Sequence, residues 1–261
     1  MNKLVRDTEQ SHCAQLLHIK DKAHLVHVTI DYSIHSQPMN DVHKVVTQFG
    51  AVFKHAAKRE RLFHDICRRN NLADEESQKP PSVTPTRWFS FYKSAVAVRH
   101  LWSVLLSFID DSESSGEKIN ELRMLIGDQK NRQMLLVKHK HLIETLAPIH
   151  ALQEVLESSK PMLHQMYHLV NVRLKVQFSA KLTDEPQLDA NTTMVLSMLS
   201  VADTSLVKAD LVGFNKSLGE KWQATCARNL REDVCGSEGL WKKAVVLDPF
   251  LKLSQSQDFM S

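Results

Sequence analysis

The chain has 261 residues, with 33 basic and 30 acidic side chains and a formal net charge of +3. Its length suffices for a buried core in one or two domains, and its small net charge neither requires nor excludes nucleic acid as a partner. With 7 glycines and 8 prolines it has fewer turn residues than an average protein, which excludes a structure rich in tight hairpins and favours long helices.

The first 71 residues predict two helices. Residues 21–34 have apolar side chains at helical spacing, and Asp21 is placed to accept a capping hydrogen bond from a first-turn amide. Residues 42–67 continue one apolar stripe, which predicts a single long amphipathic helix that ends at Asn70. The other faces of this helix carry the basic residues Lys54, His55, Lys58, Arg59, Arg61, Arg68 and Arg69.

The remainder of the chain predicts a loop followed by more helices. Residues 72–86 are acidic and then proline-rich, which is typical of a surface loop. The pattern as a whole predicts a mainly α protein, an antiparallel array of six to eight helices with little β structure at the ends. Apolar spacing predicts helices over 88–110, 117–126, 128–158 with Pro148 inside, 161–180, 188–200 and 204–234, and a strand over 244–247.

Four short motifs occur in the same order as in one known family. In order and spacing the chain resembles the hAT superfamily of DNA transposases, and the resemblance covers residues 21–252. The motifs are Asp21-Lys22-Ala23-His24, Thr86-Arg87-Trp88, the stretch from Leu142 to Pro161, and Val246-Leu247-Asp248-Pro249.

The resemblance implies how the chain is organised. Members of the family have an RNase H-like core interrupted by a helical insertion domain. This chain would hold mostly the insertion domain. The implied segments are an edge of the core with the long basic helix at 1–71, the loop at 72–86, the insertion-like helices at 87–240, and the Leu-Asp-Pro segment with a tail at 241–261.

The resemblance also implies a role for the residues that follow the loop. In the family, the tryptophan of this motif stacks on a base at the transposon end. Stacking on an aromatic ring contributes about 1–3 kcal/mol per base, and Arg87 could hold the neighbouring phosphate. Alternatively, Trp88 is the first core residue of its helix. For Asp21 and His24 the alternative to a family role is a helix cap with a hydrogen-bonded histidine.

The resemblance implies no catalytic residue in this chain. The family cleaves and joins DNA with three carboxylates that hold two divalent ions. Two of these would precede Asp21 and the third would follow Asp248, so all three would lie outside the 261 residues. We therefore expect neither enzyme activity nor a cofactor. We also expect no metal site, because His164 and His168 form a pair without a third ligand.

One predicted function is DNA binding by a domesticated-transposon protein, located in the nucleus or otherwise in the cytoplasm. Basic residues would contact the phosphates, which makes the affinity depend on salt. Alternatively, these residues form a solvated helix face that is paired with Glu60 and Asp65. The predicted DNA-binding residues are Arg87, Trp88, Lys54, Lys58, Arg59 and Arg61.

A second predicted function is that of a helical interaction module. Its apolar stripes would bind a second copy or another transposase-derived chain, because large exposed apolar patches mark partner sites. An incomplete gene model of an active transposase is a third possibility. We expect no small-molecule substrate and no membrane, since no apolar run approaches the about 20 residues of a membrane span.

Overall fold

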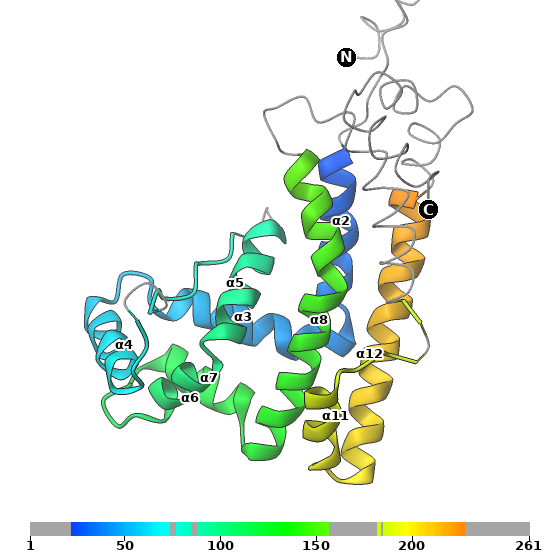
Figure 1. Cartoon of the computed structure of the whole chain (residues 1–261). Helices are drawn as coiled ribbons and strands as arrows, with labels where there is room; N and C mark the ends of the chain where they lie inside the picture. The colour runs from blue at the N-terminus through cyan, green and yellow to red at the C-terminus, as the bar shows by residue number, and fades with distance from the viewer. Residues whose placement is uncertain (1–21, 74–76, 85–87, 157–181, 184, 228–261) are drawn as a thin grey trace, which may run out of the picture.

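The computed structural model describes residues 22–73, 77–84, 88–156, 182–183 and 185–227, and these are mainly helical (Figure 1). No strand occurs within these ranges. The predicted mainly α class is therefore confirmed, whereas the predicted helix at 161–180 and strand at 244–247 lie outside the described residues. The helices are α2 (Lys22–Ile34), η1 (Gln37–Met39), α3 (Asn40–Val52), α4 (Ala57–Arg69), α5 (Trp88–His100), α6 (Trp102–Asp110), α7 (Glu117–Ile126), α8 (Gln129–Leu156), α11 (Ala190–Ser197), α12 (Val201–Trp222) and the short π-helix η3 (Gln223–Ala227).

Two groups of helices make up the described part of the chain. In the first, α2, α8 and α12 pack against one another along their lengths (Figure 1). The chain runs along α2 in the opposite direction to α8 and α12, which themselves run the same way. The array is therefore not antiparallel throughout. In the second group α3 packs on α5 and α7, and α4 packs on α6.

The predicted single helix over residues 42–67 is wrong. The helix breaks after Val52, and α4 begins only at Ala57. Ten residues of continuous helix would separate Phe53 from Phe63 by about 15 Å along its axis. In the structure their ring centroids are 5.0 Å apart, and both rings pack against Phe108. The turn lets the apolar stripes of α3 and α4 enter one core, an arrangement that a straight helix would prevent.

The predicted helix over 88–110 is also divided, at Leu101, into α5 and α6. The two helices expected over 188–200 and 204–234 occur as α11 and α12; α11 is shorter than predicted, and α12 begins earlier, at Val201, while the predicted end at 234 lies outside the described residues. Local capping explains where they start. Asp189 accepts a hydrogen bond from the backbone of Thr192, and Ser200 accepts one from Asp203. The long helix α8 continues through Pro148 as predicted.

A buried lysine connects the two groups of helices. The side chain of Lys138, on α8, is only 5% exposed. Its Nζ donates to Asp41 of α3 at 2.5 Å and to Asp210 of α12 at 2.9 Å. A buried ammonium requires such partners because leaving it uncompensated costs several kcal/mol. Nearby, His141 contacts Asn215 at 2.8 Å and adds a second polar link between α8 and α12.

Candidate functional site

A basic hollow lies where α3 turns into α4, with a volume of about 350 Å³. Three of the four lysines and arginines predicted on this helical segment to bind nucleic acid line it; the fourth, Arg61, is exposed on α4. Because Glu113 is the only acid among the lining residues, the hollow is positively charged. The residues that line it include Lys54, His55, Lys58, Arg59, Glu113 and Ser115.

The turn between the helices positions the residues at the mouth of this hollow. His55 adopts a left-handed backbone conformation, with φ of 57°. The backbone amide of Lys54 donates to Ala51 at 3.2 Å, and that of Ala56 donates to Phe53 at 3.3 Å, which closes the turn. Phe53 is buried while Lys54 and His55 are exposed. The apolar anchor thus directs its two basic neighbours into solvent.

Arg59 has a structural task within the basic hollow. Its guanidinium donates to the carbonyl of Val52 at 3.1 Å and to that of Ser115 at 3.2 Å. It thereby ties the end of α3 to the segment before α7. Gly116 permits this contact, because its φ is +113° and a Cβ atom there would lie 2.5 Å from Arg59 Nη2. Arg59 contributes charge to the hollow, but its donors are partly occupied.

Three other cations are available to a ligand. Lys54, Lys58 and Arg61 are exposed, and none of their side chains has a hydrogen bond or ion pair with another residue that the structure describes. No side chain caps the N-terminus of α4, so its first-turn amides add partial positive charge beside Lys58. A ligand with negative oxygen atoms would meet cations that give up no existing partner.

The alternative of a paired, solvated face applies to the other end of α4. Arg68 forms an ion pair with Asp65 at 2.7 Å, and Arg69 forms one with Asp111 at 3.2 Å. The hydrogen bonds to Asp111, first from the backbone of Glu113 and then from Arg69, lower the pKa of its carboxyl group. Glu60 binds Lys79 rather than an arginine of its own helix. The basic residues predicted as one face therefore divide into paired and unpaired groups.

The family-motif residues fall mostly outside the described part of the chain. This applies to Asp21, Arg87, Asp248 and Pro249. His24 lies in the first turn of α2. Trp88 is the first residue of α5, as the motif predicted. Its stacking and core roles both remain predictions.

An aromatic cluster next to Trp88 was missed by the sequence reasoning. The rings of Phe89 and His150 are stacked, with centroids 4.5 Å apart, and Tyr92 lies 4.3 Å from the same histidine. Lys93 places its Nζ 4.3 Å from the Phe89 ring centre. Burial, and then the charge of Glu154, raise the pKa of Tyr92. Spacing within α5 cannot predict this cluster because His150 comes from α8.

The described residues contain neither a metal site nor a reactive cysteine. The described residues contain no group of three histidine, cysteine, aspartate or glutamate side chains that could hold a metal ion. Cys67 is a buried free thiol, and burial raises its pKa, which disfavours the thiolate. The pair His164 and His168 lies outside the described residues.

Comparisons with known proteins identify no relative of this chain. No family model, no curated protein and no solved structure matches the chain. None of the described helices is both long and apolar enough to cross a membrane. The geometry of the basic hollow is therefore the main structural observation that bears on function.

Proposed function

We propose that the chain is a transposase-derived protein that binds nucleic acid. The observation that carries the binding proposal is the basic hollow. There, the side chains of Lys54 and Lys58 have no partner among the described residues, and they lie beside Arg59 and the uncapped start of α4. The proposed ligand is the phosphate backbone, whose oxygen atoms suit both ammonium groups and free amides.

The composition of the hollow favours phosphate contacts over recognition of bases. Lysines act as mobile point charges, and they report no base sequence when they bind phosphate. Any preference for particular bases would come from Trp88, if its ring is available for stacking, with Arg87 on the adjacent phosphate. We therefore expect salt-sensitive binding with little sequence specificity from the hollow itself.

The ancestry is a separate part of the proposal. It rests on the order of the four motifs between Asp21 and Pro249, and it would make DNA in the nucleus the relevant nucleic acid. It also names another transposase-derived chain as a candidate partner. Loss of DNA binding would refute the function without refuting the ancestry.

A double variant tests the binding proposal. We expect Lys54→Gln with Lys58→Gln to weaken binding of a labelled DNA duplex, because two phosphate contacts are removed. The slope of log affinity against log salt concentration should fall by about 2. Fluorescence anisotropy over a range of salt concentrations measures both quantities. In the same assay Trp88→Ala should weaken binding of single-stranded more than double-stranded DNA if the ring stacks on bases.

The matched control removes the same charge elsewhere. Lys208 and Lys216 are both exposed on α12, so Lys208→Gln with Lys216→Gln changes the net charge equally. It should leave the salt slope close to that of the native chain. An equal effect of both double variants, or no binding by the native chain at low salt, would contradict the proposal.

A further inference from the structure

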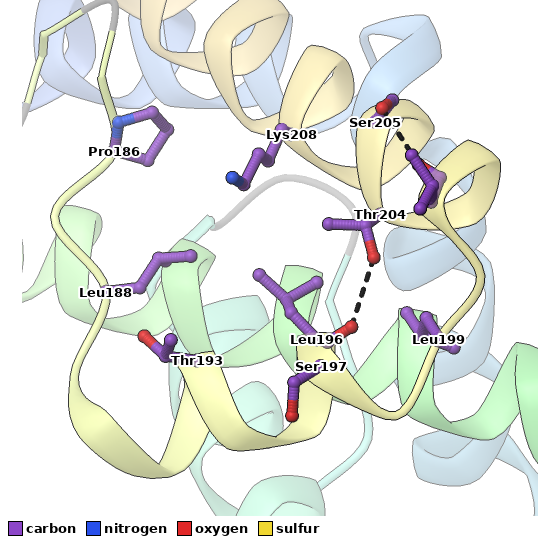
Figure 2. Close-up of a pocket in the computed structure, with 10 residues that line it drawn as sticks. Pro186, Leu188, Thr193, Leu196, Ser197, Leu199, Thr204, Ser205 and Lys208 are labelled. Atoms are coloured by element: carbon purple, nitrogen blue, oxygen red, sulfur yellow. Dashed lines mark hydrogen bonds between the residues drawn. The ribbon is translucent and has the colours of Figure 1, made fainter.

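A second hollow, mostly apolar, lies between α11 and the first turns of α12 (Figure 2). Its volume is about 680 Å³, and the segment before α11 closes one side. We call it the apolar groove. Its apolar walls come from Pro186, Leu188, Leu196, Leu199 and Val201, and Lys208 extends into it from α12.

The walls of the apolar groove are held in place by local hydrogen bonds. Thr204 of α12 donates to the carbonyl of Leu196 at 3.0 Å, which ties the two helices together (Figure 2). Asp189 caps α11, and its carboxylate also binds Lys140 of α8. The hydrogen bonds from Lys140 and then from Thr192 hold the pKa of Asp189 far below its usual value. A groove fixed in this way exists before any partner binds.

Apolar side chains extend beyond the groove into solvent. Of the eight large hydrophobic residues exposed in the described ranges, four lie between positions 194 and 206. Each of them lines the groove or is next in sequence to a residue that does. Methionines adapt to varied partner surfaces, and clustered exposed apolar residues mark interaction sites. The four are Met194 at 59%, Met198 at 57%, Val201 at 85% and Leu206 at 54% exposure.

Lys208 is the one charged residue among the described residues that line the groove, and it indicates the charge of a partner. The side chain of Lys208 is exposed and has no hydrogen bond or ion pair with any residue that the structure describes. Two acids next in sequence to residues of the groove are already paired with other lysines, because Asp189 binds Lys140 and Asp203 binds Lys130 at 3.3 Å. A partner with a carboxylate at this point would complement the lysine.

We propose that the apolar groove binds an amphipathic helix of another protein, one with an acidic residue beside its apolar face. Both long walls are helices, and the described ranges offer no strand edge on which an extended peptide could pair. The 8 residues of α11 make a wall about 12 Å long, which matches about two turns of a partner helix. The proposal is independent of nucleic-acid binding.

Selection from a displayed library of randomised helical peptides, about 14 residues long, tests this proposal with the full chain as bait. The native chain should select peptides with apolar residues at positions i, i+3, i+4 and i+7 and an acidic residue beside them. Lys208→Glu should change that acidic preference to a basic one. In anisotropy measurements with the selected peptide, Lys208→Glu should weaken binding about fivefold, and an acid-to-lysine change in the peptide should restore it.

Two controls separate the alternatives. Lys216→Glu adds the same charges on α12 outside the groove and should keep the acidic preference. Val201→Asp should abolish binding without affecting the fold, since the side chain is 85% exposed. The proposal is overturned if no apolar–acidic peptide is selected or if both lysine variants behave alike. It is also overturned if sedimentation shows a dimer that Val201→Asp dissociates, because the occupant is then a second copy.

Discussion

The basic hollow and the apolar groove are built in different ways. The basic residues Lys54, His55 and Lys58 of the hollow are near neighbours in sequence, and one tight turn brings them together, while Glu113 and Ser115 complete the lining. The apolar groove instead needs three segments, and Leu196 in its wall is also part of the core. A charged site can therefore be altered with little effect on folding, whereas an apolar site shares its stability with the protein interior.

The largest expected effect comes from Lys138, which joins the two groups of helices. Lys138→Met should lower the free energy of unfolding by about 2–3 kcal/mol, because Asp41 and Asp210 lose their shared cation. Their partial exposure, 41% and 26%, lets water offset some of the loss. Urea denaturation measures this change in the free energy of unfolding. The same change at the exposed Lys216, Lys216→Met, should alter the free energy of unfolding by less than about 0.5 kcal/mol. Equal values would show that Lys138 does not link the two groups of helices.

Acid should destabilise the protein through two histidines, one on α8 and one on α3. His139 of α8 is buried, and burial, followed by the charge of Arg99, lowers its pKa to about 3. Burial, followed by the charge of His35, lowers the pKa of His43 on α3 to about 4. Because both values lie below the ordinary value of 6.5, the unfolded chain takes up protons first. The contribution of these two histidines to the free energy of unfolding is fully present above pH 6.5. It declines as the pH falls from 6.5 towards their lowered pKa values.

The slope of this decline is at most about 1.4 kcal/mol per pH unit for each histidine. Urea denaturation at pH 7 and pH 5 should therefore show a weaker protein at pH 5. His139→Gln should reduce the difference, because one of the two protons is no longer taken up. If the variant keeps the full difference between the two pH values, His139 is not responsible for it.

The smallest effect distinguishes the cations within the basic hollow. Arg59→Ala should lower the free energy of unfolding by about 1–2 kcal/mol, because the carbonyls of Val52 and Ser115 lose their donor. Lys58→Ala should change it by less than about 0.5 kcal/mol, since no described residue depends on that ammonium. Thermal denaturation measures both. Equal losses would mean that the two hydrogen bonds of Arg59 do not stabilise the fold.

Some elements were predictable from local sequence. The helix at 117–126 has the predicted bounds, and Asn70 ends α4 as expected. Helical spacing alone could not reveal the break after Val52, because the apolar positions of α3 and α4 continue in the same period. The contact of Phe53 and Phe63 with Phe108, far away in sequence, decides where the chain turns.

The candidate sites also have some features that were predictable from the sequence and others that were not. The cluster of basic residues could be read from the sequence, but its division into the unpaired Lys54 and Lys58 and the paired Arg68 could not. The apolar groove was not predicted at all, because its walls are an ordinary apolar helix pattern until α11 and α12 are placed together.

The sequence by itself determined the mainly helical character and the charge of individual segments, since both follow from spacing and composition over a few turns. Only the tertiary structure decided which cations are free and which apolar residues remain exposed. The physical reason is that an ion pair or a buried contact requires a partner, and partners such as Asp111 for Arg69 come from distant parts of the chain.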